Sequence, residues 1–138
     1  MNSFFSPSVK IWYEPGMTLI RIITGLFMVY HGVEVFDAKQ MQEYTKWLTD
    51  LKFPNPAVMA YLGKTAEFIG GCCITLGLFT RVTVWPMILT MLGVCFGMGK
   101  GKIFYEDQHP FMFVLIGLIF FFNGPGRYSV DQALFGRK

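Results

Sequence analysis

Five side chains that can bind metals or exchange protons occur in this chain as two one-turn pairs and one lone carboxylate. His31 and Glu34 are three residues apart, so they would share one face of a helix. Glu106 and His109 have the same spacing, and Glu67 stands alone among apolar neighbours. Helical proteins that hold two metal ions combine Glu-x-x-His turns with lone Glu residues on facing helices. One interpretation is therefore a metal site made by all five side chains.

Proton transfer beside a quinone is the second interpretation. Ionisable side chains within a membrane are costly and are typical of proton relays, and quinone chemistry needs a proton route beside its electrons. Glu67 would then accept the proton, and His31 would hydrogen-bond to the quinone oxygen or to Glu67. Lys64 lies one turn before Glu67 and completes the predicted cofactor-binding residues. In a third interpretation, these three side chains only pair with one another or with the backbone and hold helices together.

A second polar group is expected at the opposite end of the helices and has a structural interpretation. Its members are Arg21, Arg81, Arg127 and Asp131. Arg21 opens the first apolar segment, and Asp131 follows a Gly-Pro-Gly turn after the last one. We expect these two side chains to pair and so to fasten the chain end to the first helix.

Four apolar segments must position these residues. The first is long enough to cross a bilayer, at about 30 Å as a helix of 1.5 Å rise per residue. A different segment, residues 37–56, mixes charges with apolar residues three and four apart, which predicts an amphipathic helix on the membrane surface. The apolar segments are residues 17–36, 57–79, 82–98 and 109–123, and residues 127–138 are expected to be a short tail.

Small residues predict where these helices approach one another. Gly63, Glu67, Gly71 and Thr75 follow at steps of four and place the lone carboxylate on a close-packing stripe. Gly93 and Gly97 form a second pair of this kind in the third apolar segment.

Composition excludes several classes of protein. Of the 138 residues, 53% are hydrophobic and only 15% are charged, which is too apolar for a soluble domain of this size. A net charge of +3, dispersed along the chain, does not support nucleic-acid binding. The first ten residues lack the pattern of a cleavable signal. The predicted fold is all-α: one multi-pass domain over residues 1–138, an antiparallel bundle of four transmembrane helices with an amphipathic surface helix between the first and second spans.

Charge gives only a weak indication of orientation. An even number of spans puts both termini on one side, and the 12 Lys and Arg residues divide equally between the two sides. All the arginines fall on the side of the termini, whereas the opposite loops hold most of the acids. This pattern favours termini in the cytoplasm.

Short motifs along nearly the whole chain are similar to those of one membrane protein family. They are Arg21, His31-Gly32, Glu67 with Gly70-Gly71, Gly77-Leu78-Phe79-Thr80-Arg81, and Gly124-Pro125-Gly126-Arg127-Tyr128-Ser129-Val130-Asp131. With these motifs the chain resembles the DoxX-like proteins. Val35 departs from the family pattern, in which a Lys is expected a turn after the His, so no role of that Lys carries over.

The resemblance implies a bacterial or archaeal inner-membrane protein with four helices, cytoplasmic termini and a redox connection. Relatives include the membrane subunit of a thiosulfate:quinone oxidoreductase, and others associate with oxidative-stress enzymes. The sequence shows no flavin, haem or iron–sulfur motif, so electrons would come from a partner redox protein.

The leading hypothesis is a small membrane subunit of a quinone-linked redox system, with Glu67 and His31 handling protons. The alternatives are a non-catalytic membrane anchor or assembly subunit, and the metal site described above. The expected partners are membrane lipid and either a redox protein or further copies of the chain. Transport of a small solute would need a polar path, and the last apolar segment offers only Asn123.

Overall fold

The computed structural model describes residues 10–136, which form helices and no strand. The elements in chain order are α1 (Tyr13–Gly32), a 3₁₀ turn η1 (Val33–Phe36), α2 (Ala38–Asp50), α3 (Pro56–Leu76), α4 (Thr80–Leu92), a π-helical segment η2 (Gly93–Met98), α5 (Gln108–Asn123) and α6 (Val130–Phe135). The prediction about a signal rests largely on residues 1–9, which lie outside the described residues, as do residues 137–138.

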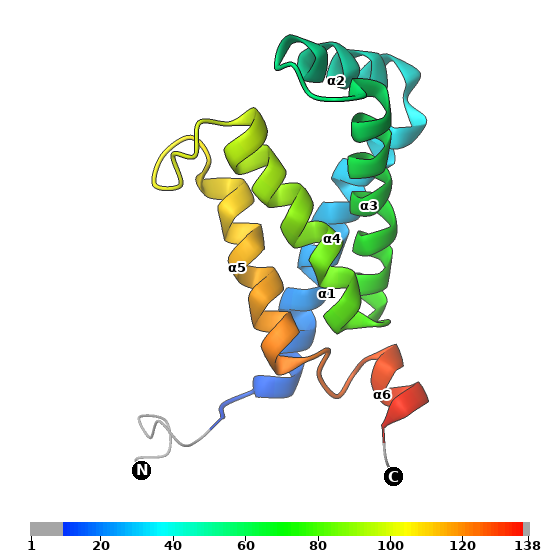
Figure 1. The fold of residues 1–138 in the computed structure, drawn as a ribbon. Helices are drawn as coiled ribbons and strands as arrows, with labels where there is room; N and C mark the ends of the chain where they lie inside the picture. The colour runs from blue at the N-terminus through cyan, green and yellow to red at the C-terminus, as the bar shows by residue number, and fades with distance from the viewer. Residues whose placement is uncertain (1–9, 137–138) are drawn as a thin grey trace.

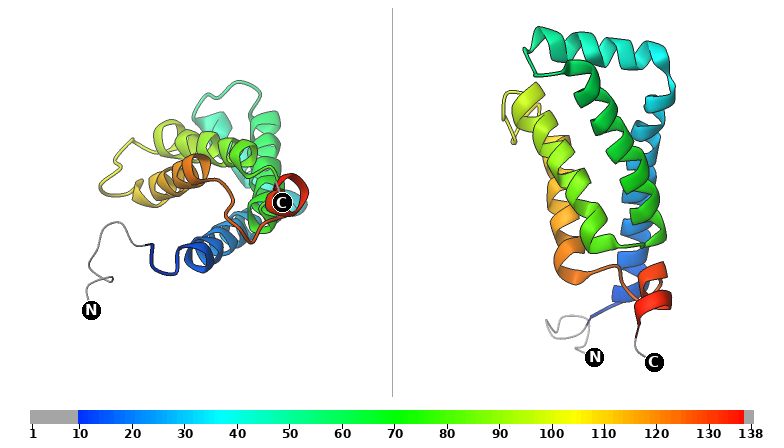
Figure 2. Two further views of the ribbon diagram at one scale, coloured as in Figure 1. Left: turned by 90° about the horizontal axis from the view of Figure 1, so that it is seen from below. Right: turned by 45° about the vertical axis from the view of Figure 1, so that its right-hand side comes forward.

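The long helices α1, α3, α4 and α5 lie alongside one another, with α2 across one end and α6 at the other (Figure 1). We call these the α2 end and the terminal end. Seen along the helices, α3 lies between α1 and α4, and α5 packs on α4 (Figure 2). Contact between α1 and α5 is sparse and includes the rings of Phe27 and Phe113, whose centroids are 6.5 Å apart. The helices therefore form a row that bends back on itself rather than a closed ring.

Local sequence accounts for where these helices begin and end. The Asp37 carboxylate accepts hydrogen bonds from the backbone N–H of Lys39 at 2.9 Å and of Gln40 at 3.3 Å, which starts α2. Pro56 occupies the first turn of α3, where a missing N–H costs no helical hydrogen bond. Gly77 ends α3 at φ 70°, a left-handed conformation that glycine adopts without a steric penalty.

The closest helix contact joins the backbones of α1 and α3. A Cβ added at Gly71 would lie 2.6 Å from the amide nitrogen of Val29 and 2.9 Å from the carbonyl oxygen of Gly25. A Cβ at Gly25 would lie 2.6 Å from the amide nitrogen of Thr75. The predicted stripe of small residues is therefore confirmed at Gly71 and at Thr75, which lies against Gly25 of α1. At Gly25 and Gly71 only glycine leaves room for this approach.

Two other predictions about small residues are wrong. A Cβ at Gly63 would meet nothing nearer than Thr90 Cγ2 at 3.9 Å, so no helix approaches closely there. A Cβ at Gly93 would meet nothing within 4 Å, and at Gly97 only the ring of Phe53 lies close. The third apolar helix uses side chains instead: Met87 and Ile88 fill the space above Gly117 of α5.

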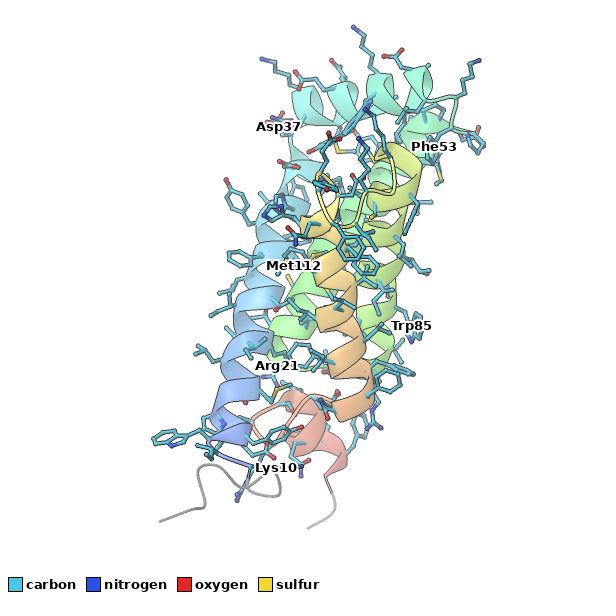
Figure 3. The ribbon with its side chains drawn as sticks, turned by 90° about the vertical axis from the view of Figure 1, so that its left-hand side faces the viewer. Lys10, Arg21, Asp37, Phe53, Trp85 and Met112 are labelled. Carbon is cyan, nitrogen blue, oxygen red and sulfur yellow. The ribbon has the colours of Figure 1, made fainter. Side chains whose placement is uncertain are left out.

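The α2 helix covers one end of the molecule with its apolar face. Met41 and Leu48 are 1% and 6% exposed and pack with Ala60 of α3, Phe53 and Met98. Figure 3 shows Asp37 and Phe53 at this end and Lys10 at the other. The predicted amphipathic helix is confirmed, and its buried face fixes α2 above α3.

All four predicted apolar segments are helical, but they differ in their capacity to cross a membrane. Within the described residues, Tyr13–Phe36 and Thr80–Met98 are long and apolar enough, and Gln108–Asn123 is apolar but shorter. α3 has 21 residues and carries Lys64 and Glu67. The predicted tail is wrong in one respect, because Val130–Phe135 forms α6, started by a hydrogen bond from the Gln132 N–H to Ser129 Oγ at 3.2 Å.

Candidate functional site: a buried cluster of two carboxylates and a lysine

A charged cluster lies where α1, η1, α2 and α3 meet at the α2 end. Lys64 Nζ is 2.8 Å from Glu34 Oε2 and 3.0 Å from Glu67 Oε2. Glu34 is carried by η1, whereas Lys64 and Glu67 are one turn apart on α3. The 3₁₀ turn after Gly32 places the Glu34 side chain within reach of α3. One ammonium group therefore bridges two carboxylates from different parts of the chain.

Tyr44 of α2 closes this cluster from above. Its hydroxyl donates a hydrogen bond of 2.8 Å to Glu34 Oε2, and Lys64 Nζ lies 4.6 Å from the centre of its ring. Partial burial and the hydrogen bond to the Glu34 carboxylate raise the pKa of the Tyr44 phenol. In the sequence, the spacing of Tyr44 from Met41 and Leu48 indicates only that it lies on the apolar face of α2.

Burial increases from Glu34 to Glu67. The side chains of Glu34, Lys64 and Glu67 are 29%, 13% and 5% exposed. With Lys64 protonated and both carboxylates ionised, the cluster would carry one net negative charge away from water. Because one cation serves both carboxylates, the protonation states of the three groups are coupled.

His31 lies beside this cluster but not within it. Its backbone carbonyl oxygen is 3.4 Å from Lys64 Nζ, whereas the imidazole is on the surface, against the ring of Tyr30 with centroids 5.5 Å apart. The predicted hydrogen bond between His31 and Glu67 is absent from the described residues. The contact that His31 makes with α3 is through its backbone carbonyl rather than its imidazole.

The predicted metal site is not assembled in this structure. Residues 10–136 contain no group of three or more His, Cys, Asp or Glu side chains placed to hold one ion. Glu106 and His109 are both exposed and take no part in the cluster around Lys64. Their spacing is correct, but Glu106 precedes α5 in a loop and so does not share a helix face with His109.

The buried acid of that loop is Asp107, which is not among the predicted site residues. Its Oδ2 accepts the backbone N–H of Lys100 at 3.0 Å and of Lys102 at 2.9 Å. Its carbonyl oxygen lies 3.6 Å from the thiol of Cys95 in η2. Asp107 therefore shapes the loop between η2 and α5, and nothing before folding distinguishes it from its neighbour Glu106.

The structural group at the terminal end uses backbone partners. Arg21, 2% exposed, donates through Nη1 to the carbonyl of Pro125 and through Nη2 to the carbonyl of Tyr128, the latter at 2.7 Å. Asp131 accepts from the backbone N–H of Phe79 at 2.6 Å and of Thr80 at 2.9 Å, so it caps α4. The predicted ion pair between Arg21 and Asp131 is therefore wrong, although both residues do fasten this end.

The other two arginines of this group contribute less directly. The guanidinium of Arg81 lies over Gly124, and its residue is exposed. Arg127 is held by its backbone, whose N–H donates 2.8 Å to Glu14 Oε2. Glu14 belongs to this end as well, although its sequence position before Pro15 gives no sign of it.

These features define a class: a small helical membrane protein with a charged cluster among its helices and a chain end fastened by buried polar contacts. The chain belongs to the DoxX family, whose profile matches residues 16–100. The resemblance of its motifs to that family is thus confirmed.

Two curated relatives cover most of the chain. A protein of Bacillus subtilis strain 168 named "Putative oxidoreductase CatD" is 25% identical over 127 residues, which are 91% of this chain and 92% of the relative. "Uncharacterized membrane protein Rv3486" of Mycobacterium tuberculosis is 28% identical over 139 aligned positions, covering 87% of this chain and 82% of the relative. No solved structure matches this chain significantly.

Proposed function

We propose that this protein is a small inner-membrane subunit of a quinone-linked redox system, in which the cluster around Glu67 exchanges protons. The observation that carries this proposal is the Lys64 ammonium held between the Glu34 and Glu67 carboxylates, 2.8 and 3.0 Å away, among membrane helices. A relative named as an oxidoreductase supports the redox connection. The electrons pass to or from a partner redox protein.

The positions of His31 and Glu67 suggest separate roles. The exposed imidazole of His31 is accessible to a molecule that diffuses in the membrane, whereas the buried carboxylate of Glu67 is not. We assign His31 to hydrogen bonding with the quinone oxygen and Glu67 to proton exchange. Lys64 joins them, because its ammonium lies 3.0 Å from the carboxylate of Glu67 and 3.4 Å from the carbonyl of His31.

The proposed membrane arrangement is an antiparallel bundle in which α1, α3, α4 and α5 each cross the bilayer. α3 crosses despite Lys64 and Glu67 because their charges face the cluster and each other rather than lipid. α5 has 16 residues, about 24 Å of helix, which is shorter than the hydrocarbon core of about 30 Å. In this arrangement the loop before α5 covers its α2 end. The termini then lie on one side, in the cytoplasm.

The test is the quinone content of the purified protein. Wild type, Glu67→Gln, His31→Ala and the control Glu43→Gln on the exposed face of α2 are extracted in mild detergent, and bound quinone is quantified by chromatography. We expect about one quinone per chain in wild type and in the control, and a loss of tenfold or more, about 1.4 kcal/mol, in the other two. His31→Ala removes the hydrogen bond to the quinone, and Glu67→Gln weakens the hold on the Lys64 ammonium, which lies 3.4 Å from the carbonyl of His31.

Two results would contradict the proposal. Quinone absent from the folded wild type would exclude a resident cofactor. Quinone unchanged in a folded Glu67→Gln variant of lower thermal stability would instead support the anchor, in which the cluster only binds helix to helix.

A further inference from the structure

An open cleft of about 490 Å³ lies at the terminal end, where the start of α4, the end of α5 and α6 converge (Figure 1). Its lining includes Phe79, Arg81, Val82, Asn123, Gly124 and Asp131. The cluster around Lys64 lies at the other end of the molecule, so this cleft has no part in the function proposed above.

Arg81 is the cation of this cleft, and its charge is uncompensated. Neither an ion pair nor a hydrogen bond to its side chain occurs within residues 10–136. The guanidinium lies beside Gly124, where an added Cβ would be 3.4 Å from its Nη2 and 3.6 Å from its Nε. Gly124, at φ 80°, carries no side chain to cover the guanidinium, so the N–H groups of Arg81 stay available.

The carboxylate that shares the cleft is already occupied. Asp131 accepts one backbone N–H on each oxygen, from Phe79 at 2.6 Å and from Thr80 at 2.9 Å. Its negative charge is also offset by the start of α4. Asp131 therefore does not neutralise Arg81, which agrees with the absence of an ion pair between them.

The cleft sits where the apolar surface of the helices gives way to polar residues. Arg81 precedes the exposed Val82, and Asn123 follows the exposed Phe122, which are 68% and 72% exposed. One turn beyond Arg81, Trp85 projects from the side of α4 and packs on Phe121 with ring centroids 5.2 Å apart (Figure 3). A Trp near an Arg at a helix end is typical of the interface between hydrocarbon and lipid head groups.

We propose that this cleft binds the phosphodiester of an anionic phospholipid. The planar fork of Arg81 matches two phosphate oxygens, the side-chain amide of Asn123 supplies a further donor, and Val82 and Phe122 contact the acyl chains. An arginine suits this role better than a lysine, because only its fork can bind the phosphate through two parallel hydrogen bonds.

The test compares lipid binding in wild type, Arg81→Gln and the control Arg127→Gln. Arg127 is an exposed arginine at the same end that lies outside the cleft and holds Glu14 only through its backbone. Purified protein in neutral detergent is titrated with phosphatidylglycerol, with phosphatidylcholine and with inorganic phosphate, and the thermal unfolding midpoint is followed by circular dichroism.

We expect phosphatidylglycerol to raise the midpoint of wild type and of Arg127→Gln, and its apparent dissociation constant to rise about tenfold or more in Arg81→Gln. Phosphatidylcholine and millimolar phosphate should give little or no shift. An equal shift with phosphatidylcholine, an equal shift with phosphate alone, or an unchanged affinity in Arg81→Gln would each overturn the proposal.

A second measurement leaves Arg81 intact, in case its substitution prevents folding. With Trp12 and Trp47 replaced by Phe, the fluorescence of Trp85 reports on the lipid beside α4. Brominated phosphatidylglycerol should quench it at a lower mole fraction than brominated phosphatidylcholine does. Equal quenching by the two lipids would mean that no anionic lipid is selected at this cleft.

Discussion

At the scale of single residues, the arrangement around Lys64 explains how this chain tolerates two carboxylates among its helices. An isolated buried carboxylate is strongly disfavoured, and an ion pair offsets more of this cost when further hydrogen bonds reach the carboxylate. Glu34 has one such bond, because the Tyr44 hydroxyl donates to Oε2, the same oxygen that Lys64 contacts. Glu67 has Lys64 alone as its partner among the described residues, so it depends on this one contact more than Glu34 does.

The Tyr44 phenol should titrate at a higher pH than an ordinary tyrosine, whose pKa is about 10. Burial and the hydrogen bond to Glu34 raise its pKa in the folded protein. The stability this contributes is therefore complete below about pH 10 and is lost as the pH rises through the folded-state value. The measurement is the absorbance at 295 nm during titration, taken as the difference between wild type and Tyr44→Phe.

The control for this prediction is Glu34→Gln, which keeps a hydrogen-bond acceptor but removes its charge. The phenol assigned to Tyr44 should then ionise at a lower pH than in wild type. A difference spectrum centred at or below about pH 10 in the folded wild type would show that Tyr44 is not enclosed as the structure has it.

The sequence predicted only those contacts of the site that join residues one turn apart on the same helix. Lys64 with Glu67 follows from their spacing, and the structure forms that pair. Glu34 and Tyr44 join it because η1 and α2 turn back over α3, a long-range geometry that no local spacing encodes. Arg21 shows the same limit, since its partners are carbonyl groups that every residue carries.

At the scale of elements, the contact between α1 and α3 rests on backbone rather than on side chains. Gly71 should therefore tolerate no Cβ: Gly71→Ala forces the helices apart against the Val29 amide and the Gly25 carbonyl. We expect a loss of about 1–3 kcal/mol, the usual cost of overpacking. The measurement is thermal or dodecyl sulfate unfolding of the detergent-solubilised protein, followed by circular dichroism.

Gly63→Ala is the matched control, two turns earlier on the same helix. Its Cβ would find open space, with Thr90 Cγ2 at 3.9 Å, so the substitution should be neutral or should stabilise by about 0.5–1 kcal/mol. Equal effects of the two substitutions would mean that α1 does not approach α3 as closely as described.

The helices themselves were predictable, because long apolar runs separated by Pro, Gly and charge leave few alternatives. α1, α3, α4 with η2, and α5 cover the predicted segments. α6 was not predictable, because its six residues are stabilised by distant contacts: the Asp131 N–H donates to the Gly77 carbonyl at 2.9 Å, and its carboxylate caps α4. The close contact predicted at Gly93 does not form, because a small residue permits the close approach of another helix but does not cause it.

At the scale of the whole molecule, the two ends are held by different interactions. The terminal end depends on Arg21, Asp131 and Glu14, each bound to backbone groups, which fixes the path of the chain after α5. The α2 end depends on charges that can gain or lose protons. A change of pH should therefore affect the contacts of the α2 end more than those of the terminal end.

The proposed four crossings require that these two ends lie on opposite sides of the membrane. Single cysteines introduced at the exposed positions Gln42, Lys102 and Arg127, in a background with Cys72, Cys73 and Cys95 replaced by Ala, test this with a membrane-impermeant maleimide. Each long helix runs from one end to the other, so Gln42→Cys and Lys102→Cys should react in intact cells, and Arg127→Cys only after permeabilisation (Figure 1). The reverse pattern would keep the four crossings and invert the orientation. Reaction of Gln42→Cys and Arg127→Cys from the same side would exclude the four crossings, because the two ends of the long helices would then lie on one side of the membrane (Figure 1).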